Sequence, residues 1–257
     1  MPTALALSPH LDDAAFSCGG LLASLAQAGW RVVMATLFTG SVAEPRGFAL
    51  ACQLDKGLGP EVDYMALRRD EDVRAAAALG IAPPVHLPFR EAPHRGYGSA
   101  PELFADTRAD DGVAAELAPA IAGLIAAGSP DLLLAPQAIG GHVDHVQTVR
   151  ALRGLAPAQP ILWWRDFPYT VREAAPKAPL ADLFADLAEP AMRLAVAVLA
   201  GRFAGEAAPA LAALRPDLPV IRVPHPSPTY VCTAPEVPER IRRGLAEAAA
   251  ILDRTSG

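Results

Sequence analysis

Short apolar runs alternate along the chain with stretches in which apolar residues recur at helical spacing. The apolar runs stop at polar, glycine or proline residues and predict buried strands at residues 3–7, 31–38, 85–89, 131–135 and 161–164. The periodic stretches predict helices at residues 14–28, 63–79, 112–127 and 146–155. Strands that alternate with helices of this length favour an α/β protein of the Rossmann-like type, with a mostly parallel sheet and helices on both faces.

Two stretches within this pattern lack a regular period. Residues 41–60 contain several glycines and prolines and predict a loop. Residues 90–111 combine glycines and prolines with many charges. Because a loop of this length in a compact domain usually serves a functional site, we expect residues 90–111 to form a rim or a lid.

The pattern is weaker beyond residue 170. There we expect helices near residues 180–187, 190–199 and 207–214, a short strand at 220–223 and a final helix at 238–252. The sequence has no internal repeat and no obvious interdomain linker. We therefore expect a single domain over residues 1–257, with a motif-bearing core of about residues 1–170 and a less regular part over 171–257.

Composition narrows the classes of function. Hydrophobic residues make up 52% of the chain and charged residues 19%, which suits a large core. The net charge of -6 argues against a nucleic-acid partner. No apolar run reaches the roughly 20 residues of a membrane helix, and the N-terminus lacks the regions of a signal peptide. With 3 widely spaced cysteines, we expect a cytoplasmic protein without a membrane partner. The oligomeric state stays open.

Polar clusters follow two of the predicted strands. His10, Asp12 and Asp13 come after the strand at residues 3–7, and His142, Asp144 and His145 come after the strand at 131–135. The carboxyl ends of parallel strands meet at one edge of the sheet, so we expect both clusters to line one crevice there. Imidazole and carboxylate ligands together suit zinc, with Fe²⁺ or Mn²⁺ as the less suitable ions. For either cluster alone, the structural alternative is a hydrogen-bonding histidine beside aspartates that cap a helix.

The two clusters resemble the motifs of a known family. Ser8-Pro9-His10-Leu11-Asp12-Asp13 is similar to the (P/A)HPDD signature of the PIG-L/LmbE-like zinc deacetylases, and Gly140-Gly141-His142-Val143-Asp144-His145 is similar to their later HPDH or HxDH motif. Residues 67–80 resemble the intervening helix of that family, and the agreement extends over roughly residues 4–155. Leu11 and Val143 stand where the family has proline, and Gly140 stands where some members carry a tyrosine.

This resemblance implies a role for each polar residue of the two clusters. The ligands of the zinc ion would be His10, Asp13 and His145. Asp12 would be the general base that takes a proton from the attacking water. His142 would stabilise the oxyanion or protonate the leaving amine, and Asp144 would tune the charge of His142.

The candidate substrate-binding residues are Arg68, Glu91 and Asp166. Arg68 matches a position near the sugar in relatives, although its helix also allows a surface ion pair with Glu71 or Asp72. Glu91 falls where relatives often have a substrate-binding aspartate, and Asp166 follows the strand at residues 161–164. The remaining rim charges are expected to be solvated loop residues: Arg90, His94 and Arg95.

Three functions are compatible with these residues. The leading interpretation is a zinc-dependent hydrolase that removes an acetyl group from the amide nitrogen of an N-acetylated amino sugar or glycoconjugate, a small-molecule substrate. A rival is an amidase of the same family that cleaves a different N-acyl group. A third is a non-catalytic, nucleotide-binding Rossmann-like protein. The first turn lacks G-x-G-x-x-G, and its two aspartates would repel a pyrophosphate, which disfavours the third.

Overall fold

The structure is a computed structural model that describes residues 1–172, 175–184, 197–200 and 220–223, together with Arg243, Ala246, Glu247 and Ala250. Its residues group into two compact units, Met1–Asp186 and Leu187–Gly257. Each unit is described by itself. The single domain over residues 1–257 stays a prediction.

A parallel sheet forms the centre of the first unit. Its strands are β1 (Thr3–Ser8), β2 (Arg31–Thr36), β3 (Val85–His86), β4 (Leu132–Pro136) and β5 (Ile161–Trp164). They lie in the order β3-β2-β1-β4-β5, and every pair of neighbours is parallel. The chain moves outward from β1 to β3 and then returns to the other side of β1 at β4. Sheets of this kind bind ligands at the carboxyl ends of the strands where the order reverses, which here is between β1 and β4.

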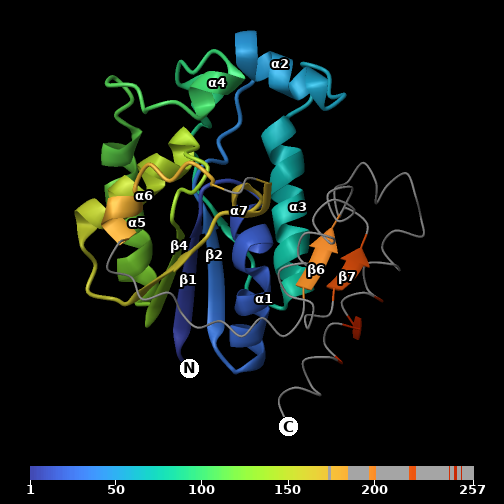
Figure 1. The fold of residues 1–257 in the computed structure, drawn as a ribbon, viewed down its shortest axis with the longest axis vertical. Helices are drawn as coiled ribbons and strands as arrows, with labels where there is room; N and C mark the ends of the chain where they lie inside the picture. Colours follow the sequence, from blue (N-terminus) through green and yellow to red (C-terminus); the bar gives the residue numbers. More distant parts are fainter. Residues whose placement is uncertain are drawn as a thin grey trace. The chain divides into compact units, whose positions relative to one another are not determined.

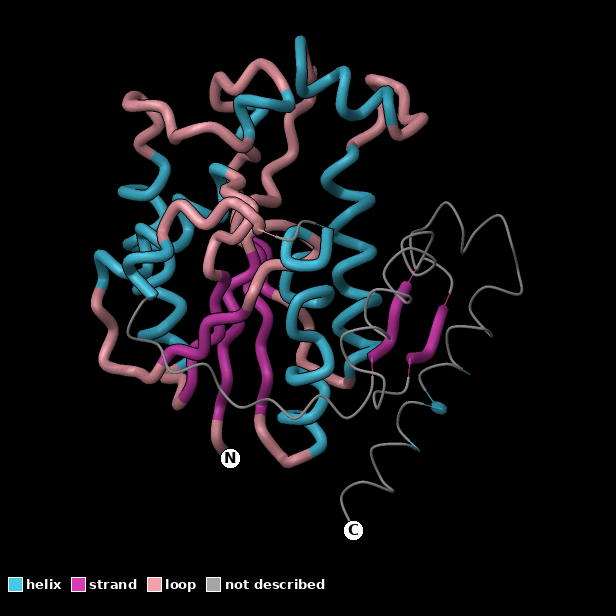
Figure 2. Tube along the Cα trace, viewed as in Figure 1, coloured by secondary structure: helices cyan, strands magenta, loops and turns pink. Residues whose placement is uncertain are grey.

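Helices cover both faces of this sheet (Figures 1 and 2). The long helices are α1 (Asp13–Gln27), α3 (Tyr64–Leu79), α5 (Val113–Gly128) and α6 (Val143–Leu155). Successive side chains of a strand point to opposite faces, so Leu5 and Leu7 of β1 pack in the core with α5 and α6. Ala4 and Ala6 of the same strand pack in the core on the side of α1 and α3. The predicted α/β fold with helices on both faces is therefore confirmed.

The predicted loops contain regular structure. Helix α2 (Gly47–Asp55) lies inside residues 41–60, and it buries only Ala49 and Gln53, too few to give an apolar stripe in the sequence. Residues 90–111 contain the 3₁₀ helix η1 (Ala92–His94) and the short helix α4 (Ala100–Leu103). Tyr97 between them is 1% exposed. This segment is thus packed against the protein, and in Figure 1 both α2 and α4 lie on the side of the carboxyl ends of the strands.

Helix α6 begins at Val143, earlier than the predicted residue 146. The side chain of His142 accepts a hydrogen bond from the backbone N–H of Asp144 and so caps the helix. Histidine is not among the usual N-cap residues, which is why the sequence pattern missed this start. As a result, Asp144 and His145 lie in the first turn of α6, and the helix fixes the directions of their side chains.

The last described segments confirm one prediction and correct another. Helix α7 (Tyr169–Arg172) and the 3₁₀ helix η2 (Ala181–Phe184) end the first unit. In the second unit, β6 (Ala197–Ala200) pairs in parallel with β7 (Val220–Val223), which confirms the strand at 220–223. The helix predicted at 190–199 is wrong for residues 197–199, because a short apolar run cannot be assigned by its period.

Two further predictions fall largely beyond the described part of the chain. The helix expected at 207–214 lies outside the described residues, and so does most of the helix expected at 238–252. The four described residues of the latter are helical. Among the described residues, none of the helices combines the length and the apolar character needed to cross a bilayer.

Candidate active site

The structure brings the two predicted clusters together between β1 and β4. His10 follows β1, and His142 follows β4. The ring centroids of these two histidines lie 4.8 Å apart, and those of His10 and His145 lie 5.2 Å apart. Residues far apart in the sequence therefore face one another at the point where the strand order reverses.

The three predicted zinc ligands point their donor atoms at one another. Oδ2 of Asp13 lies 3.1 Å from Nδ1 of His10 and 3.0 Å from Nε2 of His145. The same oxygen accepts the backbone N–H of His10 at 2.8 Å. Within the described residues, His10, His142 and His145 also have ring nitrogens within 4.8 Å of one another. We call His10, Asp13 and His145 the triad, because a carboxylate oxygen there joins two imidazole nitrogens directly.

The opposite ring nitrogen of each triad histidine is held by a buried carboxylate. Nε2 of His10 lies 2.9 Å from Oδ2 of Asp144, and Nδ1 of His145 lies 2.7 Å from Oδ1 of Asp166. Asp144 is fully buried and Asp166 is 1% exposed. Carboxylates behind metal-binding histidines fix the tautomer and the orientation of the ring. This arrangement leaves Nδ1 of His10 and Nε2 of His145 as the nitrogens that face the centre of the triad.

Both carboxylates make direct contacts that the sequence did not predict. Asp144 was expected to tune the charge of His142. Its charge does oppose the lowering of the pKa of His142, but its direct contact is with Nε2 of His10. Asp166 was expected to face substrate, yet its carboxylate is occupied inside the protein. Besides His145, it accepts the backbone N–H groups of Gln137 at 3.1 Å and Ile139 at 3.0 Å.

Asp13 and the two histidines of the triad shift one another's pKa values. Burial lowers the pKa of His145, but Asp13 and Asp166 outweigh it and raise that pKa to about 9. Burial likewise opposes ionisation of Asp13, but His145 and His10 hold its pKa well below the usual range. Burial also lowers the pKa of His10, but Asp13 and Asp144 raise it well above the usual value, so the protonated rings and the carboxylate compensate one another. A metal binds only deprotonated ligands, so its binding here would release protons.

His142 differs from the triad histidines in its environment. Its Nδ1 accepts the backbone N–H of Asp144 at 3.2 Å, so the neutral ring carries its proton on Nε2. Burial, with a further contribution from the charge of His10, lowers the pKa of His142 to about 3. Its ring packs edge-on against Phe104 at 5.3 Å between centroids. His142 is therefore a neutral hydrogen-bond donor beside the triad.

Asp12 lies at the mouth of the site and contacts both Arg68 and the solvent. Its side chain is 45% exposed and lies 3.2 Å from Nη2 of Arg68. Nη1 of Arg68 lies 3.1 Å from Oε1 of Glu91. Asp12 forms no side-chain cap on α1, so helix capping does not explain it. Three of the predicted site residues, Asp12, Arg68 and Glu91, therefore form one ion-pair group.

Sequence reasoning missed Arg95. We expected a solvated loop charge, but the side chain of Arg95 is 13% exposed and lies 2.8 Å from Oδ1 of Asp144. Arg95 therefore contacts two aspartates, because Asp111 lies 2.9 Å from the same guanidinium nitrogen. No sequence period connects position 95 with position 144, so only the fold reveals the pair. The length of the segment 90–111 was the one signal that pointed to this region.

The structure accounts for Gly140, which stands in place of the tyrosine of some relatives. A Cβ atom at this position would collide with the ring of Tyr169. The φ angle of Gly140 is +93°, a conformation that other residues rarely adopt. The ring of Tyr169 in turn lies 5.8 Å from Phe104 and 6.3 Å from His145, centroid to centroid. Phe104 and Tyr169 thus form an aromatic wall beside the site.

Known proteins are similar to this chain in sequence and fold. The family model PIG-L, GlcNAc-PI de-N-acetylase, matches residues 5–156. The 2'-N-acetylparomamine deacetylase of Streptomyces fradiae is 36% identical over 192 residues, which cover 70% of this chain and 66% of that protein, just under two thirds of its length. A structure of the teicoplanin deacetylase Orf2 in a zinc-inhibited form is 31% identical with a TM-score of 0.59, covering 69% of this chain and 73% of that one. A deacetylase–teicoplanin complex is 31% identical with a TM-score of 0.60, covering 69% of this chain and 75% of that one. The family model spans more than half of the chain and contains both histidine motifs. The chain therefore belongs to the PIG-L family.

Proposed function

We propose that this protein is a zinc-dependent hydrolase that removes the acetyl group from the amide nitrogen of an N-acetylated amino sugar or glycoconjugate. The observation that carries the proposal is the triad of His10, Asp13 and His145, in which each histidine has a buried carboxylate on its opposite nitrogen. Two similar proteins, named as deacetylases of N-acetylparomamine and of teicoplanin, support an amino sugar as the substrate class.

The donor set of the triad fits a catalytic zinc ion. Such an ion usually has three protein ligands, with nitrogen and oxygen donors among them, and keeps one position open. Two imidazole nitrogens and one carboxylate oxygen supply that set here. Fe²⁺ and Mn²⁺ accept the same donors, so metal analysis must identify the ion. When bound, zinc would polarise the amide carbonyl and acidify water.

Asp12 is the general base in this proposal. It is adjacent to the triad residue Asp13 in the sequence, and its half-exposed carboxylate can reach a water molecule at the mouth of the site. The ion pair with Arg68 holds the carboxylate in place at 3.2 Å. After it has taken the proton from the attacking water, Asp12 can pass it to the departing nitrogen.

His142 stabilises the negative charge that develops on the carbonyl oxygen. Its Nδ1 is used as an acceptor by the backbone of Asp144, which leaves the Nε2–H as the donor. A fixed donor that meets a developing oxyanion lowers the barrier of acyl transfer, and it does so best where water is excluded. The geometry favours this role over donation of a whole proton to the amine, because the neutral ring would become an anion.

Arg68 and Glu91 are the proposed contacts to the sugar. Both are partly buried, with side-chain exposures of 15% and 18%, and they form one ion pair beside Asp12. A guanidinium and a carboxylate in contact offer donors and acceptors to neighbouring hydroxyl groups. Asp166 is reassigned in the proposal from substrate binding to orientation of His145.

The test is acetate release by the zinc-loaded protein from N-acetylated amino sugars. We expect release by the wild type and release that is about 10²- to 10⁴-fold slower in Asp12→Asn, with the zinc content unchanged in this variant. Asp70→Asn, the same change at an exposed position of α3, is the control and keeps the activity. If the wild type spares acetyl groups but cleaves a longer acyl chain from the same sugars, the amidase alternative replaces this proposal.

A further inference from the structure

The segment between β3 and α5 contacts the candidate metal centre through Arg95. Nη2 of this residue lies 2.8 Å from Oδ1 of Asp144, and the Asp144 side chain is fully buried. Among the described residues, Oδ1 of Asp144 has no partner that meets hydrogen-bond geometry. The ion pair with Arg95 is therefore the interaction that compensates the charge on this oxygen. A buried carboxylate that loses such a partner is left with an uncompensated charge.

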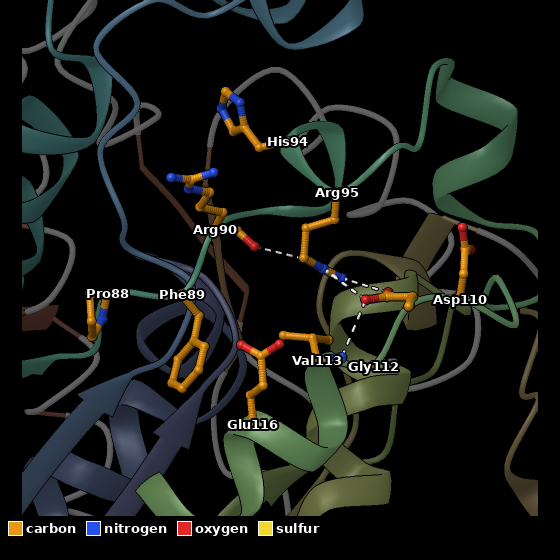
Figure 3. A pocket seen from close by; sticks show the side chains of 10 residues that line it. Pro88, Phe89, Arg90, His94, Arg95, Asp110, Gly112, Val113 and Glu116 are labelled. Atoms are coloured by element: carbon orange, nitrogen blue, oxygen red, sulfur yellow. Dashed lines mark hydrogen bonds and ion pairs between the residues drawn. The ribbon is translucent and has the colours of Figure 1, made fainter.

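Arg95 is itself held in one orientation by three further groups. Its Nε and Nη2 lie 3.0 Å and 2.9 Å from the two carboxylate oxygens of Asp111, in a two-pronged arrangement. Its Nη1 donates to the backbone carbonyl of Arg90 at 2.6 Å. Figure 3 shows the side chain of Arg95 and its contact with the backbone carbonyl of Arg90. The guanidinium also lies 5.0 Å from the ring centroid of Phe38. A planar fork of donors suits this arrangement, and the single ammonium group of lysine does not reproduce it.

These contacts form a chain that runs from Asp111 through Arg95 and Asp144 to His10. Oδ2 of Asp144 lies 2.9 Å from Nε2 of His10 and accepts the backbone N–H of Ala92 at 3.1 Å. Oδ1, the other oxygen of the Asp144 carboxylate, is held by Arg95. Each oxygen of Asp144 thus has its own anchor, and the carboxylate cannot rotate without breaking one of them. The ring of His10 is then fixed with Nδ1 toward Asp13.

We propose that Arg95 is a positioning residue for the metal centre, which holds the Asp144 carboxylate so that His10 presents Nδ1 as a ligand. The inference rests on the proposed function, because it assigns a metal to the triad. This role gives a reason for the packing of residues 90–111 against the protein, because the segment supports a ligand on the side away from the metal. Losses of groups that support a ligand in this way typically weaken metal binding by about 10- to 100-fold.

The surroundings of Arg95 allow a direct chemical test. Arg95 lines a pocket of about 390 Å³ together with Phe89, Arg90 and Glu116, as Figure 3 shows. Shortening the side chain would leave space that is continuous with this pocket. A small guanidinium ion can enter there and take the place of the missing group, whereas it could not repair a general defect of folding.

The experiment compares the zinc dissociation constants of purified full-length variants, measured by competition with a chromophoric chelator. We expect about 10- to 100-fold weaker binding in Arg95→Met and an intermediate value in Arg95→Lys. Arg90→Met is the matched control, since its side chain lines the same pocket outside the chain of contacts, and it should bind zinc as the wild type does. In Arg95→Ala, added guanidinium should restore part of the affinity, while added sodium at equal ionic strength should not.

Two results contradict the inference, and they are distinguishable. Wild-type affinity in Arg95→Met, with the wild type binding one zinc ion, overturns the role of Arg95 and leaves the proposed function intact. A wild type that binds no zinc overturns both. If Arg95→Met does not fold, Arg95→Lys decides, because wild-type affinity in that variant contradicts the need for the fork. At saturating zinc, the kcat of Arg95→Met should recover toward that of the wild type, and its KM should be unchanged. This result separates a role in positioning the ligand from a contact with substrate.

Discussion

The carboxylate of Asp166 provides a close test of how the ring of His145 is oriented. In the structure, Oδ1 lies 2.7 Å from Nδ1 of His145, and Oδ2 accepts the backbone N–H groups of Gln137 and Ile139. The change Asp166→Asn keeps the shape of this side chain and replaces one acceptor by a donor. It therefore alters the hydrogen-bond pattern while leaving the packing almost unchanged.

The amide can be placed in two ways, and their costs differ. If its oxygen keeps the two backbone donors, its NH₂ group points at Nδ1 of His145, and the ring proton must move to Nε2. The opposite placement points the NH₂ group at the backbone N–H groups of Gln137 and Ile139. Gln137 keeps the carbonyl of Trp164 as an acceptor, but the buried N–H of Ile139 is left unpaired, at about 1–3 kcal/mol. The first placement is favoured. It puts a proton on Nε2, the nitrogen that lies 3.0 Å from Asp13 and would bind the metal.

We therefore expect Asp166→Asn to weaken zinc binding by about 10- to 100-fold, which corresponds to about 1.4–2.7 kcal/mol. Chelator competition measures this change, and urea unfolding of the metal-free variant checks that the fold is retained. Asp182→Asn, at an exposed position of η2, is the control and should bind zinc with unchanged affinity. Wild-type affinity in a folded Asp166→Asn would refute the assignment of Asp166 to the orientation of His145.

Three further predictions follow from the same geometry. Asp12→Asn should lower kcat by about 10²- to 10⁴-fold with zinc retained, and loss of zinc in this variant would make Asp12 a ligand instead. His142→Ala should lower kcat by about 10²- to 10³-fold, again with zinc retained, and an unchanged kcat would remove His142 from the oxyanion role. Gly140→Ala should lower the free energy of unfolding by about 1–3 kcal/mol, because its Cβ meets Tyr169 at a positive φ angle. Gly123→Ala, at an open position of α5, should instead raise the free energy of unfolding by about 0.5–1 kcal/mol. Urea unfolding measures both glycine variants. Equal effects of the two changes would contradict the collision between a Cβ at position 140 and Tyr169.

Local sequence patterns were sufficient to predict the sheet and the position of the candidate site. His10 and His145 each follow a strongly apolar strand, and the rule that ligands bind at the carboxyl ends of strands brings them together without knowledge of contacts. The same reasoning failed where a helix has few buried residues, as in α2. It also failed at 197–199, where the apolar run is too short for a helical or an extended period to be distinguished.

The supporting contacts of the site were beyond the reach of these patterns. Asp144 was expected to tune the charge of its sequence neighbour His142, and it does, but the sequence did not reveal its direct contact with His10. Arg95 was expected to be solvated, since charged residues in a glycine- and proline-rich segment usually are. Its partner Asp111 lies at the end of the same segment and Asp144 lies in α6, so Arg95 meets both only after the segment has packed over the strands. Such pairings depend on tertiary structure and leave no periodic trace in the sequence.

The central claim is that the triad holds a metal ion on which removal of the acetyl group depends. It is tested most directly by acetate release from an N-acetylated amino sugar during titration of the metal-free protein with zinc. The account predicts no release without metal, a rise that is complete at about one zinc ion per chain, and no rise in His145→Ala. Full activity of the metal-free wild type, or an equal rise in His145→Ala, would contradict it.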